Sequence, residues 1–113
     1  MKIYVAGPYC PHEGDIHDAI TIAAQNTKRA IQAGIQLIKK GHLPYIPHLS
    51  HFIHQESEEP LPREYWYRAD FEWLRDCHAL LLIGHSKGAD AELAWAIEHD
   101  MKVYYSIDEV PQA

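Results

Sequence analysis

The first candidate for chemistry in this sequence is a carboxylate, Glu92, which follows the apolar run ALLLI and the turn-rich stretch GHSKGAD. A carboxylate near the start of a predicted helix has two interpretations. It can complement the positive end of the helix dipole, which stabilises a helix by about 0.3–1 kcal/mol. It can also be the reactive group of a site. Asp90 fits the first interpretation equally well, so the residue types alone leave both open.

Two residues from other parts of the chain could act with Glu92. Asp70 lies in an aromatic-rich segment that is predicted to be helical, and Tyr4 lies in the first β-rich run, KIYVAG. Taken singly, the aspartate is typical of a solvated helix surface and the tyrosine of a core strand. Two acids and a tyrosine from three elements could nevertheless form one constellation at the edge of a sheet.

The turn before Glu92 has the composition of an anion site. Gly84, Ser86 and Gly88 leave backbone N–H groups free at the start of a helix, an arrangement that suits a phosphate. His85 and Lys87 lie in the same turn and could supplement the binding of a phosphate, the alternative being that both are simply exposed.

The elements that position these residues alternate between strand and helix. Short β-rich runs end in turn residues, and the segments between them carry apolar residues at helical spacing. Strands are predicted at residues 2–7, 43–47, 79–83 and 103–107, and helices at residues 15–40, 62–75 and 88–99. This order predicts an α/β fold, a Rossmann-like three-layer sandwich with a parallel sheet of four to five strands, in one domain spanning residues 1–113.

Local signals refine this outline. The continuous apolar run ALLLI predicts a central strand covered on both faces, whereas the prolines of LPYIP predict a short strand towards an edge. Asp15 and Gly41 are typical caps of the first helix. Asn26 lies within this helix, where it is expected to bond a neighbouring loop. Residues 48–61 are predicted to form a long loop or a short irregular helix.

Ligands of open parallel sheets bind at the carboxyl ends of the strands. Three segments should meet there: Gly7, Pro8 and Tyr9 after the first strand, the PHLSH segment after the second, and the glycine-rich turn after the apolar strand. We expect His48, at the end of the second strand, to face the pocket as a hydrogen-bond donor to the substrate.

Neither a metal nor a cofactor is expected. His48, His51 and His54 resemble a ligand array, but on a helix the first and last would point about 600° apart around the axis and would not converge. The sequence also contains neither the GxGxxG dinucleotide fingerprint nor the GxxxxGK[ST] P-loop, which disfavours a nicotinamide-dependent or ATP-driven enzyme.

Composition limits the partners. A formal charge of -6 and a pI near 5.8 argue against a nucleic acid polymer or an acidic membrane surface, although a small nucleotide remains compatible. No apolar run approaches the roughly 20 residues of a membrane helix, and no signal peptide is expected. The two cysteines, Cys10 and Cys77, favour a reducing compartment, so we expect a cytoplasmic location.

Three motifs, IYVAGPY, YRADFEWL and SKGADAELAWA, together resemble the nucleoside 2-deoxyribosyltransferase superfamily. This superfamily includes the 2'-deoxynucleoside 5'-monophosphate N-hydrolases. The resemblance runs from residue 3 to about residue 105. It implies that Glu92 is the nucleophile, that Asp70 handles the proton at the leaving base, and that Tyr4 touches the nucleophile. Attack requires an ionised Glu92, a state that helix N-terminal amides would favour.

Ser86 bears on the substrate. The resemblance places it at a position that is aspartate in many transferases, where it contacts the sugar hydroxyl, and serine in the monophosphate hydrolases, where it contacts the phosphate. A neutral hydroxyl repels a phosphate dianion less than a carboxylate would. The serine therefore favours a nucleotide substrate.

The resemblance implies cleavage of the N-glycosidic bond of a (2'-deoxy)nucleoside or nucleoside 5'-monophosphate by a retaining mechanism, with hydrolysis favoured over base exchange. It also implies a homodimer or larger oligomer. The aromatic residues of the predicted helix 62–75, Trp66 and Trp73 among them, are interpreted as core and subunit interface rather than a base-stacking platform. The alternatives are a nucleotide-binding or sensing module without catalysis and a structural partner.

Overall fold

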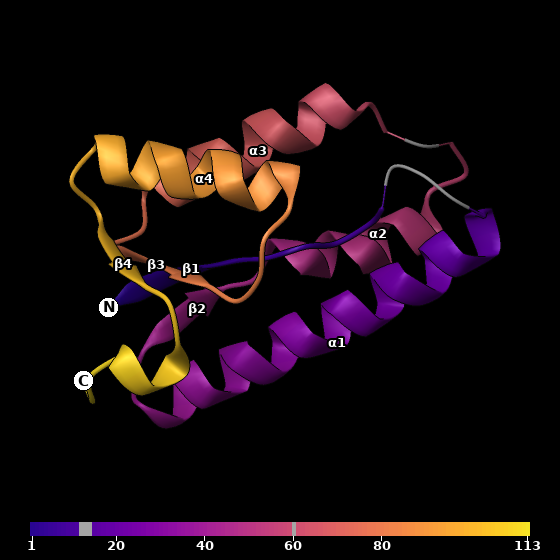
Figure 1. Ribbon diagram of the computed structural model, residues 1–113. Coiled ribbons are helices and arrows are strands. Elements are labelled where there is room, and N and C mark those ends of the chain that lie inside the picture. Colours follow the sequence, from indigo (N-terminus) through magenta and orange to yellow (C-terminus); the bar gives the residue numbers. More distant parts are fainter. Residues whose placement is uncertain (12–14, 60) are drawn as a thin grey trace.

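The structure, a computed structural model, describes residues 1–11, 15–59 and 61–113. Within these residues four parallel strands form one sheet in the order β2-β1-β3-β4 (Figure 1). The strands are β1 (Lys2–Ala6), β2 (Leu43–Tyr45), β3 (Ala79–Leu82) and β4 (Lys102–Tyr104). The helices are α1 (Ile16–Lys39), α2 (Ser50–Glu56), α3 (Arg63–Arg75) and α4 (Lys87–Glu98), with 3-10 turns η1 (Pro47–Leu49) and η2 (Ile107–Glu109). The predicted α/β sandwich is confirmed.

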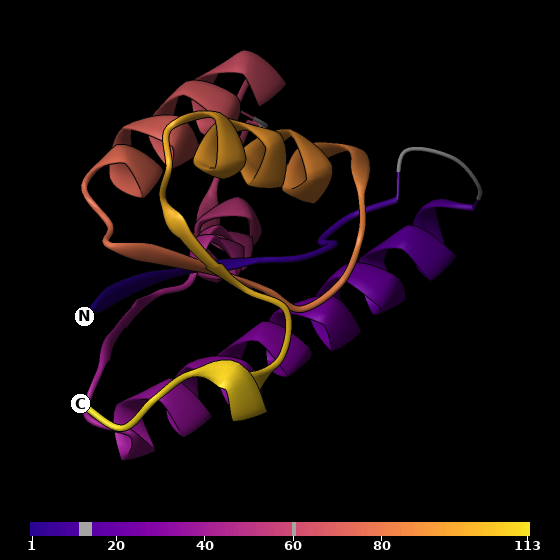
Figure 2. The ribbon, with the colours of Figure 1, turned by 60° about the vertical axis from the view of Figure 1, so that its left-hand side comes forward.

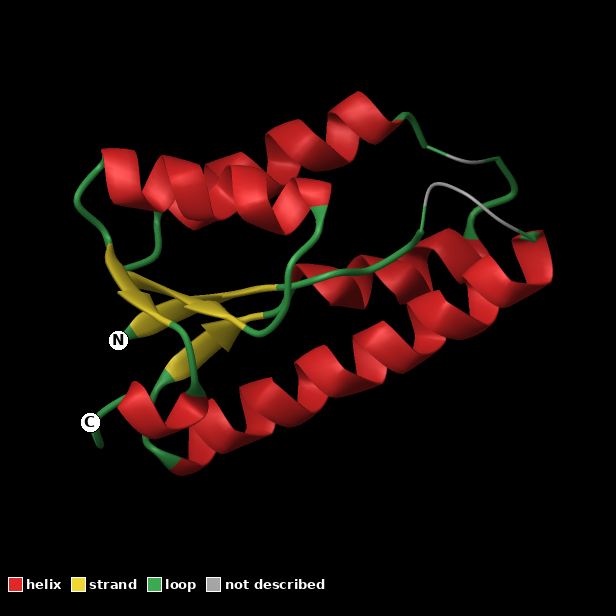
Figure 3. Ribbon diagram, viewed as in Figure 1, coloured by secondary structure: helices red, strands yellow, loops and turns green. Residues whose placement is uncertain are grey.

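The sheet separates two helical layers. In Figures 1 and 2, α1 and η2 cover one face, and α3 and α4 cover the other; Figure 3 shows the strands between them. Because side chains alternate along a strand, β1 sends Ile3 and Val5 towards α1, and Tyr4 and Ala6 towards α3 and α4. Both faces of the central strands are therefore core, and Tyr4 belongs to the α3–α4 side.

The positions of the strands follow from their composition. β3 is buried along its whole length between β1 and β4, which confirms the prediction of a central strand. β2 is three residues long and lies at an edge, where Pro44 is tolerated. The fourth strand is shorter than predicted, because the amide of Tyr105 donates to the Glu109 carboxylate at 3.0 Å instead of continuing the ladder.

The first helix has the predicted caps. The Asp15 side chain accepts a hydrogen bond from the amide of His17 at 2.7 Å, and Gly41 follows the helix with φ +87°, a left-handed conformation that favours glycine. Of the two alternatives predicted for residues 48–61, a long loop or a short irregular helix, the structure shows the helix. The segment makes the turn η1 and then the short helix α2.

The C-terminal segment folds back along α1. Lys40 Nζ donates to the carbonyls of Ile107 and Val110 at 3.0 and 2.7 Å, and His42 Nε2 donates to that of Pro111 at 2.7 Å. Val110 is buried in the core on the α1 face. Both ends of the chain consequently lie on the same side, at the amino ends of the strands (Figure 1).

Candidate active site

Tyr4 and Glu92 form a buried pair on the α3–α4 side of the sheet. The Tyr4 hydroxyl donates a hydrogen bond to Oε2 of Glu92, and both side chains are buried. Tyr4 is held between Tyr45 of β2 and Leu80 of β3, its partners in the ladder. The structure thus brings together two of the residues that the sequence indicated.

The helical position of Glu92 excludes one of its two interpretations. α4 begins at Lys87, so Glu92 lies in its second turn, and it shares the buried stripe of Ala89 and Ala96 at spacings of three and four. The acid in the first turn, where a carboxylate complements the helix dipole, is Asp90. The capping interpretation is therefore wrong for Glu92.

Asp70 is the third member of the cluster. It lies on α3, partly buried, and burial raises its pKa from 3.8 to about 7. Burial likewise raises the pKa of Glu92 from 4.5 to about 8; the Tyr4 hydrogen bond opposes this rise, and the charge of the nearby Asp70 adds to it. Burial and the two carboxylates also raise the pKa of Tyr4, so this phenol stays protonated. The expectation that helix N-terminal amides keep Glu92 ionised is wrong for this structure.

The two carboxyl groups consequently behave as a pair. Because the pKa of Asp70 is raised to about 7 and that of Glu92 to about 8, and the charge of Asp70 disfavours that of Glu92, the pair holds one proton over part of the range around neutral pH. In such a pair the protonated carboxyl group can act as a general acid while the ionised one acts as a nucleophile.

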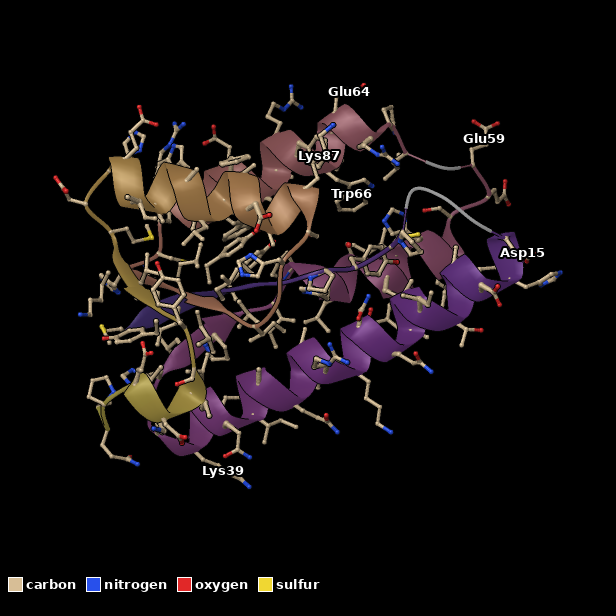
Figure 4. All side chains as sticks on the ribbon, viewed as in Figure 1. Asp15, Lys39, Glu59, Glu64, Trp66 and Lys87 are labelled. Carbon is tan, nitrogen blue, oxygen red and sulfur yellow. The ribbon has the colours of Figure 1, made fainter. Side chains whose placement is uncertain are left out.

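The turn before α4 has the expected position but not every expected contact. Ser86 is the N-cap of α4, and its Oγ accepts from the amide of Ala89 at 3.0 Å, which leaves its own O–H free to donate. Lys87 is exposed at the start of the helix (Figure 4). His85 Nδ1 lies 2.7 Å from Oδ1 of Asp90, so this histidine is engaged with a carboxylate within the chain.

A cavity of about 430 Å³ opens beside Asp70. It lies between the segment around β2, η1 and α2 on one side and α3 on the other. Its wall is mainly apolar and aromatic, and consists of Pro44, Tyr45, Ile46, Pro47, Leu49, Ser50, Ile53, Leu61, Tyr65, Trp66, Ala69, Asp70 and Trp73.

Tyr45 connects this cavity with the buried pair. Its ring stacks on that of Tyr4, with centroids 5.6 Å apart, and on that of Trp73 at 5.2 Å. This cavity was not predicted from the sequence, and Trp66 and Trp73 were expected in the core and a subunit interface. A usable signal was present, since Trp66, Asp70 and Trp73 at spacings of four and three share one face of a helix.

A family model described as a domain of unknown function, DUF7768, matches residues 1–106. The chain belongs to this family. None of the curated proteins matches it. The DUF7768 match includes Tyr4, Asp70, Glu92 and the whole wall of the cavity, whereas the segment that folds back along α1 lies mostly beyond it.

In this DUF7768 domain the predicted role of His48 is wrong. The side chain is buried, and its Nε2 donates to the carbonyls of Gly7 and Pro8 at 3.1 and 3.0 Å, so it does not face the pocket as a substrate donor. The reason is local: the turn η1 begins at Pro47 and directs the next side chain inward, under the loop after β1.

The other two histidines pack around the same loop. His51 Nδ1 lies 2.9 Å from the Tyr9 hydroxyl, and its Nε2 lies 3.2 Å from the Gln55 amide. His54 packs between the rings of Tyr9 and Trp66, and Figure 4 shows Trp66 extending from α3. Among the described residues no three histidine, cysteine, aspartate or glutamate side chains are grouped closely enough to hold a metal ion. The described helices also include none long and apolar enough to cross a membrane.

Proposed function

We propose that this domain cleaves the N-glycosidic bond of a (2'-deoxy)nucleoside or nucleoside 5'-monophosphate, with hydrolysis favoured over base exchange. The observation that carries the proposal is the carboxyl pair of Glu92 and Asp70: burial brings both pKa values close to neutral, and the charge of Asp70 adds to the rise for Glu92. Such a pair, beside a cavity of ligand size, is typical of acid and base catalysis.

The proposed reaction is a double displacement. The free Oε1 of Glu92 attacks the anomeric carbon, since Oε2 accepts the hydrogen bond from Tyr4. The C–N bond breaks, its electron pair goes to the base, and Asp70 supplies the proton. A water molecule, deprotonated by Asp70, then attacks the same carbon and releases Glu92. Tyr4 favours the reaction by stabilising the anion of Glu92, which is why its hydrogen bond opposes the rise of the pKa.

The leaving base is proposed to occupy the cavity. Asp70 lies in its wall, where the proton is needed, and the rings of Tyr45, Tyr65, Trp66 and Trp73 offer surfaces on which a planar base can stack. A cavity of about 430 Å³ lies within the usual range of small-molecule sites. This assignment replaces the interpretation of the tryptophans as interface residues alone.

The turn before α4 is proposed to hold the phosphate. The Ser86 hydroxyl, the Lys87 ammonium and the first amides of α4 can all donate to it. Gly88 leaves the helix start open, because even an added Cβ would lie 3.9 Å from Tyr67. The Asp90 carboxylate, already engaged with His85, keeps this histidine from serving as a counter-charge.

The proposal extends to assembly and location. Several large apolar side chains around the cavity are exposed, and such groups are typical of an interface, so we include a homodimer or larger assembly. They are Leu43, Leu49, Phe52, Ile53, Leu61, Tyr65 and Trp73.

Cys10 and Cys77 are both free thiols, which favours a cytoplasmic location.

The test is the release of free base from a panel of 2'-deoxynucleotides and nucleosides, measured by chromatography. Wild type should release base and Glu92→Gln should not, while the control Asp90→Asn removes an exposed carboxylate from the same helix and should stay active. Addition of a second free base separates exchange from hydrolysis. Equal release by wild type and Glu92→Gln overturns the mechanism.

One observation favours a second candidate, a module that binds a nucleotide without cleaving it. With a pKa of about 8, Glu92 is protonated at pH 7 and is then a poor nucleophile. This function is indicated if deoxynucleotides raise the melting temperature of wild type while no base is released.

A further inference from the structure

His48 is a buried polar side chain that the proposed chemistry does not use. It is 3% exposed, and its Nε2 donates to the carbonyls of both Gly7 and Pro8. Its Nδ1 is buried and has no hydrogen-bond partner among the described residues. Burial lowers the pKa of His48, so the ring is neutral, and its carbonyl partners assign the proton to Nε2. The unpartnered Nδ1 is an unfavourable feature of a buried imidazole, because a buried acceptor without a donor costs free energy. The hydrogen bonds donated by Nε2 are therefore what this position requires.

The loop that His48 holds is interlocked with the loop after β3. A Cβ on Gly7 would lie 2.5 Å from Cγ1 of Ile83, and a Cβ on Gly84 would lie 2.9 Å from Cδ of Pro8. A larger residue at either glycine would meet the other loop, so the two loops pack tightly against each other. The Ile83 amide also donates to the Ala6 carbonyl at 2.8 Å.

The same loop is anchored from two further elements. Asn26 of α1 donates through Nδ2 to the Tyr9 carbonyl at 2.8 Å, which confirms its predicted bond to a neighbouring loop. The Tyr9 hydroxyl contacts His51 of α2. These anchors act on Tyr9, whereas the two carbonyls that precede it, of Gly7 and Pro8, accept from His48 and from no other side chain in the described part of the chain.

We propose that His48 is a positioning residue that fixes the turn before α4. The contacts run from His48 to Gly7 and Pro8, from Pro8 to Gly84, and from there two residues along the chain to Ser86, the cap of the helix that carries Glu92. That this turn holds a substrate phosphate rests on the proposed function. The positional role of His48 does not.

Substitutions of His48 can distinguish the effect of its hydrogen-bond donor from the effect of the volume of its ring. The amide nitrogen of glutamine reaches the place of Nε2 and offers two N–H donors, so His48→Gln keeps the bonds to both carbonyls. His48→Asn is too short to reach them, and His48→Leu fills the space without a donor. His17→Gln, on the exposed start of α1, is the control for a histidine outside the contact chain.

Hydrogen exchange at two amides reports on the turn without any substrate. The amides of Ala89 and Asp90 both donate to Ser86, to Oγ at 3.0 Å and to the carbonyl at 2.8 Å. His48→Asn and His48→Leu should raise their exchange about tenfold, the effect expected from the loss of one buried hydrogen bond, while His48→Gln should stay near wild type. Unchanged exchange in the asparagine and leucine variants overturns the proposal, as does a glutamine variant that exchanges as fast as they do. If the leucine variant does not fold, the asparagine and glutamine pair decides.

A second measurement uses the proposed reaction. For a 2'-deoxynucleoside 5'-monophosphate, His48→Asn should raise KM more than it lowers kcat, and His48→Gln should restore KM. For the nucleoside without phosphate, KM should not change, because the turn contacts only the phosphate. An equal rise for both substrates overturns the placement of the phosphate in this turn, and the exchange comparison then decides the role of His48. If wild type releases no base, the proposed function fails, and the exchange comparison alone decides the role of His48.

Discussion

The hydroxyl of Tyr4 donates to the carboxyl group of Glu92, although the two residues lie 88 positions apart in the sequence. Each would be costly to bury alone, because a phenol and a carboxyl group both lose their bonds to water. Burial of the pair makes the central strand β1 and the helix α4 depend on each other for hydrogen bonding. The same contact holds one carboxylate oxygen and leaves the other for chemistry.

Tyr4→Phe should destabilise the fold. The change leaves the buried Glu92 without its donor, and an unsatisfied buried polar group costs about 1–3 kcal/mol. Urea unfolding of the variant should show this loss, whereas the control Tyr105→Phe, at a residue that is 55% exposed, should unfold like wild type. A Tyr4→Phe variant as stable as wild type would mean that the hydrogen bond adds nothing to folding.

The stability of the protein should depend on pH through Glu92. Its pKa rises from 4.5 to about 8 on folding, so between these values the folded protein holds a proton that the unfolded chain releases. Stability therefore falls as pH rises through this window and levels off above it. Glu92→Gln removes this contribution, so it should gain stability relative to wild type between pH 5 and pH 8. Melting curves at several pH values test this, with Asp90→Asn as the exposed control; the idea fails if the two variants follow the same pH dependence.

Base release should have a bell-shaped pH profile if the proposed function holds. The reaction needs the singly protonated pair with its proton on Asp70. The pKa values of about 7 for Asp70 and about 8 for Glu92 place most of this proton on Glu92, so only a minor share of the pair is reactive. Activity should still peak between these values and fall on both sides. Asp70→Asn cannot supply a proton, and its kcat should drop about 10²–10⁴-fold, with loss of the limb at high pH. Retention of both limbs in this variant would assign the proton to another group.

The aromatic wall of the cavity should contribute to binding of the base. Trp73 is 54% exposed and stacks on Tyr45, so Trp73→Ala should fold normally and yet raise KM. Stacking of a base on an aromatic ring is worth about 1–3 kcal/mol, which corresponds to a roughly 5- to 150-fold change. Tyr105→Ala, exposed and outside this cavity, is the matched control. Similar KM values for the two variants would place the base elsewhere.

Two glycines should respond in opposite directions to the same substitution. A Cβ at Gly7 meets Ile83 at 2.5 Å, so Gly7→Ala should destabilise the protein by about 1–3 kcal/mol. A Cβ at Gly88 has only an ordinary contact at 3.9 Å, and alanine favours a helix over glycine by up to about 1 kcal/mol. Gly88→Ala should therefore be neutral or more stable in urea unfolding. A tolerated Gly7→Ala would show that the two loops are not tightly interlocked.

The elements of this fold could be predicted because their signals are local. The unbroken ALLLI run requires cover on both faces, Pro44 belongs at an edge, and Asp15 and Gly41 mark helix ends through their own backbone chemistry. The contact of Tyr4 with Glu92 has no such local signal: it was expected only because the resemblance implies that this tyrosine touches the nucleophile.

The orientation of single side chains could not be predicted in the same way. His48 turns inward because η1 begins one residue before it, and no periodic pattern marks a 3-10 turn of three residues. The protonation of Glu92 depends on burial by several elements, so its position near a helix start was a poor guide. The cavity arises where two segments face each other, and only the α3 half of its wall has a spacing that sequence can reveal.

The course of the C-terminal segment has a practical consequence. Val110 is buried in the core, and Lys40 donates to its carbonyl and to that of Ile107. Truncation of the chain after residue 106, where the family match ends, would therefore remove a core side chain and both of these hydrogen bonds. Both ends also emerge at the amino edge of the sheet, whereas the start of α4, with Lys87, lies towards the opposite edge (Figures 1 and 4). A tag, a fused domain or a surface attached at either end would thus stand at the edge of the sheet opposite the turn before α4.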